Sequence, residues 1–292
     1  MSRGEKQYLR LVKKIIDYGY PEKGRNGNTI ALIGEKMKFS LRGNKIPFIT
    51  TKKLAWKSCL KELLWFVSGD TSNETLQKQN VKIWNGNASR EFLDSRGLIH
   101  LPENDLGPVY GHQWRFYNAK YFNSNTNYSG KGIDQLQNVI DGINYSKETG
   151  ISSRRLIINA WNPEQINEMA LPPCHVISQY FIQDGTLTCV LYQRSGDVGL
   201  GIPFNIASYG FLTHLLAKHC GLKARELVHF VGNAHIYDNH IESLREQILR
   251  VPKESPTIEI KEKKQNIDDY VFKDFLIQNY EYHNEIKMDM RA

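Results

Sequence analysis

The segment from residue 175 to residue 195, HVISQYFIQDGTLTCVLYQRS, constrains the fold of this chain more than any other stretch. Two runs rich in apolar, β-branched and aromatic residues flank the four residues Gln-Asp-Gly-Thr. An Asp-Gly pair between two such runs is among the strongest local signals for a β-hairpin. The segment therefore predicts two strands joined by a tight turn, so the fold must include a β-sheet.

Several other segments have the apolar spacing of helices. Helices are predicted over residues 5–18, 53–68, 133–147 and 206–220; the second ends before Gly69 and the last is capped by Gly221. Residues 28–41 are predicted to be extended, with Gly34 as a candidate bulge, and residues 85–104 and 117–131 to be surface loops. Because no repeat, low-complexity tract or linker interrupts the 292 residues, we expect one α+β domain over residues 1–292.

The composition is that of a soluble globular protein, with 40% hydrophobic and 24% charged residues. Apolar runs such as ELLWFV are too short to span a bilayer, and the first residues lack the apolar core of a signal peptide, so we expect a cytoplasmic protein without a membrane partner. The net charge is +7, but the lysines and arginines are scattered. This pattern favours a local anionic pocket, for example for a nucleotide phosphate, over a nucleic-acid-binding face.

The four cysteines have neither CxxC pairing nor the Cys/His spacing of a metal site, so we expect free thiols and no metal. Cys59, Cys189 and Cys220 lie in apolar patterns typical of buried small residues. Cys174 differs, because Pro172 and Pro173 stiffen the backbone directly before it. The sequence alone leaves two interpretations of Cys174 open, an ordinary strand entrance and a nucleophile held in place.

Seven segments together closely resemble the thymidylate synthase family, the folate-dependent enzymes that methylate dUMP. They are TTKKLAWKSCLKELLWFVSGDT, IW, LGPVYGHQWR, SSRRLIINAWNP, MALPPCH, YQRSGDVGLGIPFNIASY and HIY. They occur in the family's order and, with the loop that contains Arg25, cover most of residues 25–240. The resemblance implies an α+β domain with a large mixed, predominantly antiparallel sheet that packs at a homodimer interface and is flanked by helices. It also implies that 5,10-methylenetetrahydrofolate supplies the one-carbon unit and the hydride, giving dTMP and dihydrofolate.

The resemblance assigns roles around the nucleotide. Cys174 would add to C6 of the pyrimidine, with its thiolate stabilised by the guanidinium of Arg194. Asn205 would recognise uracil, because relatives that act on dCMP carry Asp at this position. The phosphate would be bound by Arg25, Arg194 and Ser195 of one subunit and by Arg154 and Arg155 of the other, and the deoxyribose 3′-hydroxyl by His235 and Tyr237; Gln193 and Asp197 complete the set.

Further roles concern proton transfer and the folate. Glu62 would organise waters that move protons, Tyr110 would help to remove the C5 proton, and His175 would belong to a water network near the base O4. The folate contacts implied are Lys52, Ile83, Trp84, Asp197, Gly201 and the terminal carboxylate of Ala292.

Each residue also has an ordinary structural interpretation. Arg154 and Arg155 could be a solvated surface pair, and Asn205 a helix cap. His235 and Tyr237 could be half-buried strand residues, and Trp84 a core residue; Glu62 could be a snorkelling side chain, and Lys52 a solvated one. A protease-like dyad of Cys174 and His175 is disfavoured, because neighbouring residues of a strand point to opposite faces.

Two other functions remain open from the sequence. A hydroxymethylase would share the early steps and deliver water instead of hydride, and shielding by Trp84 argues mildly against it. An RNA-binding regulator is permitted by the basic pI, but no arginine-rich or aromatic RNA motif supports it.

Three segments depart from the family pattern. The loop GRNGNTIALIG, which contains Arg25, is shorter by one residue than the commoner version. Asn87 stands where many relatives carry a second tryptophan near the folate. The sequence ends in IKMDMRA, with Arg291 before Ala292, rather than in a small apolar triplet.

Overall fold

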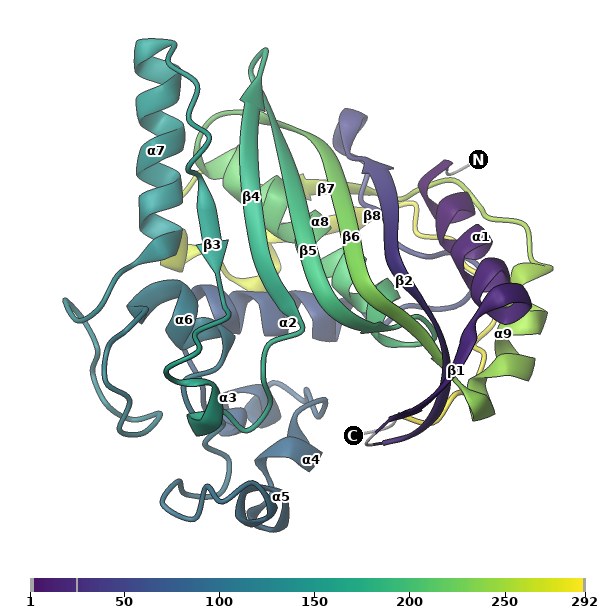
Figure 1. The fold of residues 1–292 in the computed structure, drawn as a ribbon. Helices are drawn as coiled ribbons and strands as arrows, with labels where there is room; N and C mark the ends of the chain where they lie inside the picture. The colour runs from purple at the N-terminus through teal and green to yellow at the C-terminus, as the bar shows by residue number, and fades with distance from the viewer. Residues whose placement is uncertain (1–2, 25, 291–292) are drawn as a thin grey trace.

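A six-stranded sheet forms the centre of the molecule, a computed structural model that describes residues 3–24 and 26–290. The strand order is β1-β2-β6-β5-β4-β3, and every neighbouring pair is antiparallel except β5 with β6 (Figure 1). The strands are β1 (Tyr20–Gly24), β2 (Gly27–Ser40), β3 (Ile157–Asn159), β4 (His175–Gln183), β5 (Thr186–Asp197) and β6 (Lys223–Tyr237). The expected α+β fold with a mixed, predominantly antiparallel sheet is confirmed.

The hairpin predicted from the sequence is formed by β4 and β5. Gln183 pairs with Thr186, and the two loop residues Asp184 and Gly185 have φ angles of 47° and 65°. These left-handed conformations are what a two-residue turn matched to the twist of the strands requires, and Asp and Gly are among the residues that tolerate them best. The local sequence therefore fixes the turn and, through it, the register of the two strands.

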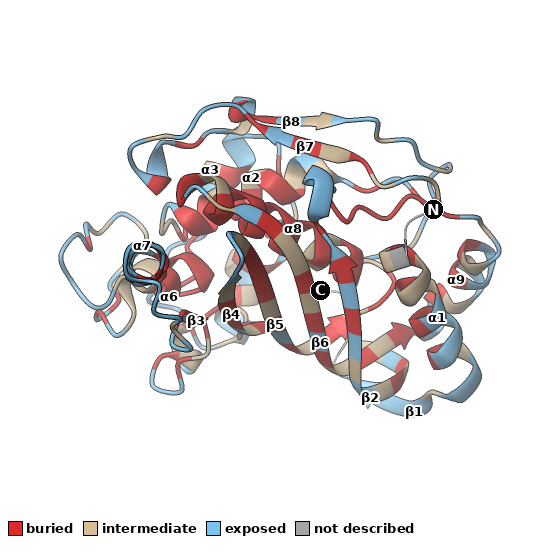
Figure 2. Cartoon of the chain, turned by 90° about the horizontal axis from the view of Figure 1, so that it is seen from above, coloured by how far each residue is buried: buried red, intermediate tan, exposed pale blue. Residues whose placement is uncertain are grey.

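Helices cover one face of the sheet (Figure 2). Helix α8 (Gly201–His219) is buried over almost its whole length against β5 and β6, and α2 (Trp56–Val67) packs on α8. Helix α1 (Arg3–Tyr18) packs on β2, with α9 (Ile241–Ile248) beside it, and α6 (Tyr110–Phe116) and α7 (Gln135–Thr149) lie near β3. The other α-helices are the short α3 (Asn73–Lys78), α4 (Asn85–Ala88) and α5 (Arg90–Ser95), and β7 (Thr257–Ile260) and β8 (Phe275–Gln278) form a small second sheet.

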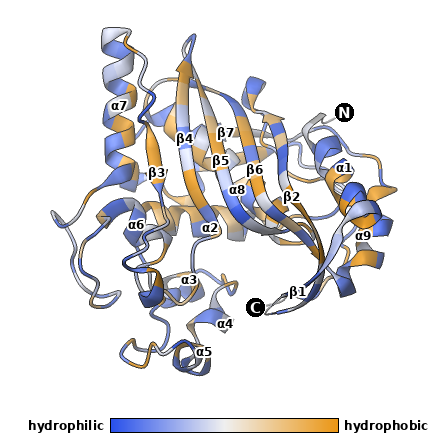
Figure 3. Ribbon diagram, in the orientation of Figure 1, coloured by the Kyte–Doolittle hydropathy of each residue, from blue (hydrophilic) through white to orange (hydrophobic). Residues whose placement is uncertain are grey.

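The opposite face of the sheet carries partly exposed apolar side chains. Ile177, Tyr192 and Phe230 are paired directly across β4, β5 and β6, and Lys36 on β2 continues the row. The three apolar residues are 36%, 44% and 38% exposed. In Figure 1 no helix crosses in front of these strands, and Figure 3 shows hydrophobic residues recurring along them.

Most predicted helices are confirmed, with shifted ends. Helix α1 ends at Tyr18 as expected, whereas α2 begins at Trp56, not residue 53, and α7 begins after Asp134, whose side chain accepts a hydrogen bond from the Gln137 N–H. Helix α8 begins five residues before the predicted start. The prediction followed the apolar run that starts at residue 206, whereas the helix also includes Pro203, which lies in the first turn, where no backbone N–H needs a helical acceptor.

Two sequence predictions were wrong. Residues 85–104 are not all loop, because Ser89 accepts a hydrogen bond from the Phe92 N–H and starts α5, after the short α4. The bulge at Gly34 is absent, since Ile33 pairs with Asn233 and Glu35 with Val231 in unbroken register. Residues 117–131 form a loop as predicted, apart from a single bridge at Tyr117. Across the described residues, no helix has the length and apolar character needed to cross a bilayer.

Candidate functional site

Cys174 lies at the entrance to β4, and the two prolines before it hold a guanidinium next to its sulfur. Arg194, on the neighbouring strand β5, donates from Nε to the Pro173 carbonyl at 2.8 Å and from Nη2 to the Pro172 carbonyl at 3.0 Å. Its Nη2 is then 3.8 Å from Cys174 Sγ. A fixed positive charge this close favours the thiolate over the thiol, which is the nucleophilic form.

The backbone and an aromatic ring complete the setting of Cys174. The Arg194 N–H donates to the Cys174 carbonyl at 2.9 Å, and the guanidinium lies over the ring of Trp161, with 5.5 Å to the centroid. The Cys174 N–H donates to the hydroxyl of Tyr110 at 2.7 Å. Burial raises the pKa of Tyr110 well above its usual value, so this hydroxyl stays protonated at neutral pH. By contrast, Cys59, Cys189 and Cys220 are free thiols with no exposed surface, as predicted.

Asn205 and His175 face each other next to this cysteine. Asn205 Nδ2 is 2.7 Å from His175 Nε2, and Asn205 Oδ1 accepts a hydrogen bond from Gln193 Nε2 at 2.8 Å. The His175 ring packs against Tyr110, with 4.8 Å between centroids. Burial lowers the pKa of His175 to about 3, so the imidazole is neutral. Because the His175 Nε2 is engaged by Asn205, the geometry is not that of a Cys–His protease dyad.

Glu62 is a buried carboxyl group on α2, and this excludes the snorkelling side chain that the sequence left open. Its side chain does not snorkel to the surface: the residue is 6% exposed, and Oε1 accepts a hydrogen bond from Trp84 Nε1 at 2.7 Å. Burial raises the pKa of Glu62 to about 8. The group is therefore mostly protonated at neutral pH and can give or take a proton near that pH.

Lys52 and Asp197 lie together at the start of α8. Lys52 is 6% exposed, which excludes the alternative of a solvated lysine, and its Nζ donates to the Gly199 carbonyl. Burial lowers the pKa of Lys52 to about 8, although the nearby charge of Asp197 acts in the opposite direction. Asp197 accepts hydrogen bonds from the N–H groups of Gly199 and Leu200, at 2.8 and 3.3 Å. Gly201, the first residue of α8, follows directly.

The residues predicted to bind the deoxyribose share one face of β6. The rings of His235 and Tyr237 meet edge to face at 5.4 Å, and His235 pairs in register with Asp197 of β5. Burial lowers the pKa of His235. Ser195 lies two residues before Asp197 on β5, so the strand ends of β5 and β6 bring this group to the same edge of the sheet as Arg194.

Comparison with known proteins fits this geometry. A family model described as "Thymidylate synthase" matches residues 6–292. The chain belongs to the thymidylate synthase family. It is 46% identical to "Thymidylate synthase" of Ascaris suum, over 99% of this chain and 98% of the relative. It is also 47% identical to "Bifunctional dihydrofolate reductase-thymidylate synthase" of Zea mays and 48% identical to that of Leishmania major, each over 98% of this chain. The chain spans about half the length of these two bifunctional relatives, 54% and 55%.

One part of the site expected from the thymidylate synthase family does not come together within this chain. Arg154 and Arg155 are exposed, in the loop before β3. Gln179 Nε2, on the far half of β4, donates to the Arg154 carbonyl at 2.9 Å. At about 3.3 Å of rise per residue, Gln179 lies roughly 17 Å along the strand from Cys174.

The remaining predicted positions have simpler descriptions. Trp84 and Asn87 are 7% and 8% exposed, and Ile83 packs against the core beside them, so Trp84 is both a core residue and the partner of Glu62. Arg25, Arg291 and Ala292 lie outside the described residues, so the predictions made for them stay predictions.

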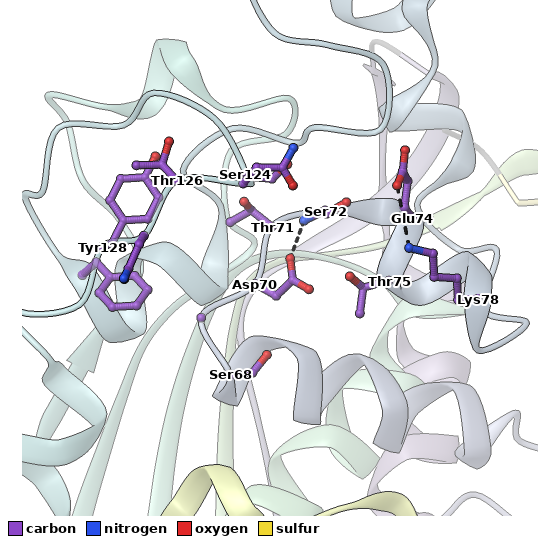
Figure 4. Close-up of a pocket in the computed structure, with 14 residues that line it drawn as sticks. Ser68, Asp70, Thr71, Ser72, Glu74, Thr75, Lys78, Ser124, Thr126 and Tyr128 are labelled. Carbon is purple, nitrogen blue, oxygen red and sulfur yellow. Dashed lines mark hydrogen bonds and ion pairs between the residues drawn. The ribbon is translucent and has the colours of Figure 1, made fainter.

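A polar pocket of about 310 Å³ lies away from Cys174, between residues 68–78 and residues 116–128 (Figure 4). The Glu74–Lys78 ion pair and the hydrogen bond from the Ser72 N–H to Asp70 are visible there. None of the residues predicted for the nucleotide or folate site lines it. Within residues 3–24 and 26–290, no group of three or more His, Cys, Asp or Glu side chains is placed to hold a metal ion.

Sequence reasoning missed three residues that contact the site. Trp161 lies under Arg194, His240 Nδ1 is 3.8 Å from an Asp197 oxygen, and His229 Nε2 is 2.9 Å from Gln193 Oε1. For His229 a signal existed: in ELVHFVG, Leu227 and Val231 alternate with exposed positions, and this places His229 on the buried face of β6. The other two are brought in by tertiary contacts for which the sequence has no local pattern.

Proposed function

We propose that this chain converts dUMP to dTMP by reductive methylation, with 5,10-methylenetetrahydrofolate as the donor of the one-carbon unit and the hydride. The observation that carries the proposal is the grouping of Cys174, Arg194 and Asn205 at one end of the sheet. A thiol beside a fixed guanidinium is a nucleophile, and a half-buried amide next to it can recognise a pyrimidine. Membership of the thymidylate synthase family and the named Ascaris relative support the same activity.

The proposed chemistry begins with addition of the Cys174 thiolate to C6 of the pyrimidine. The C6–S bond forms as the C5=C6 pair moves to C5, which becomes the nucleophile toward the one-carbon unit. Glu62, with its pKa of about 8, is suited to passing protons through water to and from the base. The Tyr110 hydroxyl, which accepts from the Cys174 N–H, would assist removal of the C5 proton.

The folate would bind between Trp84 and the start of α8. Trp84 and Ile83 offer apolar surface for flat rings, and Asp197 and Lys52 offer a carboxylate and an ammonium group for polar ends of the cofactor. When bound, the folate supplies a methylene group at the oxidation level of formaldehyde and the hydride that reduces it to methyl. Gly201 would allow close approach, and Ala292 remains the predicted carboxylate contact.

The nucleotide phosphate and sugar would be bound by the residues at the ends of β5 and β6. Arg194, Ser195 and the predicted Arg25 would take the phosphate, with Gln193 and Asp197 behind them, and His235 and Tyr237 would take the 3′-hydroxyl.

The site would be completed by a second copy of this chain. Arg154 and Arg155 are exposed in the loop before β3, and the row of Ile177, Tyr192 and Phe230 leaves apolar surface on the uncovered face of the sheet. Pairing two such faces about a twofold axis would bury this surface and exchange the arginines between sites. A cytoplasmic location stays a prediction.

A spectrophotometric assay tests the proposed function. Purified protein with dUMP and methylenetetrahydrofolate should produce dihydrofolate, seen as rising absorbance, and should do so far more slowly with dCMP. Consumption of the one-carbon unit without dihydrofolate would identify a hydroxymethylase and contradict the proposal. Absence of any reaction with either nucleotide would contradict both functions.

A further inference from the structure

A continuous chain of four side chains runs through the sheet to the predicted base-binding amide. It begins at His229 on β6, passes through Gln193 on β5 to Asn205 on α8, and ends at His175 on β4. The three links measure 2.9, 2.8 and 2.7 Å. His229 is fully buried, and Gln193 and His175 are 2% and 7% exposed.

The direction of every hydrogen bond in this chain follows from one backbone carbonyl. Gln193 Nε2 is 2.9 Å from the Ser195 carbonyl oxygen, which can only accept, so this end of the amide must be the nitrogen. The same nitrogen donates to Asn205, which therefore presents its oxygen to Gln193 and its nitrogen to His175. At the other end, Gln193 Oε1 must accept, so His229 Nε2 carries a hydrogen.

The two histidines are consequently held in different tautomers. His229 is protonated on Nε2, whereas His175 accepts on Nε2 and is protonated on Nδ1. The Nδ1 atoms of both rings are buried without a hydrogen-bond partner in the described part of the chain. Burial lowers the pKa of both histidines to about 3, so each ring is neutral.

A fixed direction matters because an asparagine amide is ambiguous by itself. Uracil offers a donor at N3 and an acceptor at O4, and cytosine offers an acceptor at N3 and a donor at the 4-amino group. Asparagine can match either base by turning its amide over. In this chain a turned Asn205 would face Gln193 Nε2 with its own nitrogen and His175 Nε2 with its oxygen. Two donors would then face each other at Gln193, and two acceptors would face each other at His175.

We propose that His229 is a positioning residue for base selectivity. It contacts neither nucleotide nor folate in the proposed binding mode. The hydrogen that it donates holds the Gln193 amide in the orientation that the Ser195 carbonyl sets, and this orientation fixes the order in which Asn205 presents its oxygen and nitrogen to the base. The inference rests on the proposed binding of dUMP at Asn205, but the tautomers on which it depends are properties of the ligand-free protein.

The tautomers can be measured directly by NMR with ¹⁵N-labelled histidine. In the ligand-free protein at pH 7, His229 should be neutral with the hydrogen on Nε2, and His175 neutral with the hydrogen on Nδ1. Assignments come from the spectra of His229→Leu and of His175→Leu. The opposite tautomer at either ring, or a charged His229, would overturn the proposal irrespective of any activity.

Selectivity is then measured as the ratio of the dissociation constants of dCMP and dUMP. In His229→Leu the buried Gln193 oxygen loses its donor, so the amide is held in its orientation by the Ser195 carbonyl alone, and the ratio should fall about tenfold. His229→Gln, which keeps an N–H donor, should retain most of the ratio. The control is His214→Leu: His214 is also buried and bonded, to the Lys45 carbonyl at 2.8 Å, and its loss should lower stability without changing the ratio.

The outcomes separate this proposal from the proposed function. If the wild-type protein fails to bind dUMP, the proposed function is wrong, while the NMR result still decides the tautomers. If dUMP binds and His229→Leu keeps the full ratio while remaining folded, only the role of His229 is wrong. An equal fall in His214→Leu would likewise contradict it, since the effect would then follow from general loosening.

Discussion

The arginines assigned to the phosphate occupy two very different surroundings. Arg194 is partly buried, held by two proline carbonyls and laid over Trp161, next to the Cys174 sulfur. Arg154 and Arg155 are exposed, and their guanidinium groups make no hydrogen bond or ion pair with the rest of the described chain. One set is arranged before any ligand binds, and the other is not.

This difference divides the site into an internal half and a shared half. In the internal half, side-chain entropy has already been lost on folding, so Arg194 can act on the thiol at no further ordering cost. In the shared half, each arginine would lose up to about 2 kcal/mol of side-chain entropy when it is ordered. On the proposed function, the chain would build its nucleophile alone and take part of its phosphate recognition from a second copy.

Replacing the nucleophile Cys174 should have the largest effect on turnover. The substitution changes only the internal half of the site. Cys174→Ala should lower turnover of dUMP at least ~10⁴-fold, because no other group in the site can form the bond to C6. The variant should stay folded and still bind dUMP, measured by equilibrium titration. Cys189→Ala, which changes a buried thiol elsewhere on the sheet, should keep its turnover. Substantial turnover by Cys174→Ala would refute the covalent mechanism.

A charge placed in the row of Ile177, Tyr192 and Phe230 should prevent two copies from pairing, and so remove the shared half of the site, while each chain stays folded. Tyr192→Lys would bury two unpaired ammonium groups in a twofold interface, and each buried charge would cost several kcal/mol of association free energy. We expect a monomer at micromolar concentration by sedimentation, with little turnover and native secondary structure. Leu249→Lys changes a residue that is 82% exposed after α9 and should leave the assembly unchanged. A dimer that survives Tyr192→Lys would place the interface elsewhere.

A mixing experiment tests whether the two halves come from different chains. Arg154→Ala/Arg155→Ala and Cys174→Ala should each have low activity alone. In a mixed dimer, one site combines the intact Cys174 of one chain with the intact arginines of the other. After subunit exchange, activity should recover to about a quarter of the wild-type level, since half of the dimers are mixed and each has one good site. Mixed dimers without recovery would show that the arginines serve their own chain.

The internal half was only partly predictable from sequence. The hairpin could be predicted, because Asp184 and Gly185 carry their conformational preference locally. The contact between Cys174 and Arg194 depends on strand register, and it was expected only from the resemblance to the thymidylate synthase family. The prediction for helix α8 started with the apolar run at residue 206 and so missed the first turn, which contains Pro203.

The buried charged side chains and their hydrogen bonds could not be predicted from the local sequence pattern. A solvated Lys52 remained an open alternative, because nothing near it in sequence shows that the Gly199 carbonyl will accept from its ammonium group. The periodicity of α2 slightly favoured a surface position for Glu62, although the side chain is buried beside Trp84. His229 could have been assigned to the buried face of its strand, but its partner Gln193 lies on another strand. Such contacts depend on tertiary packing, which cannot be predicted from secondary-structure propensity or from the alternation of apolar and polar residues.

The smallest expected effect is the pH dependence of the free energy of unfolding that Glu62 causes. It concerns the internal half of the site only. Burial raises the pKa of Glu62 to about 8 from 4.5, so the folded protein keeps a proton that the unfolded chain releases. Its contribution to stability is complete below about pH 4.5 and is lost as the pH rises toward 8. Between pH 5 and 8, the free energy of unfolding of the wild type should fall relative to that of Glu62→Gln by about 1.4 kcal/mol per pH unit. Denaturant unfolding of both proteins at several pH values measures this difference, in which the opposing contributions of the buried histidines cancel. Parallel curves would mean that Glu62 ionises freely in the folded protein, and the carboxyl group would then lack the proton that the mechanism requires.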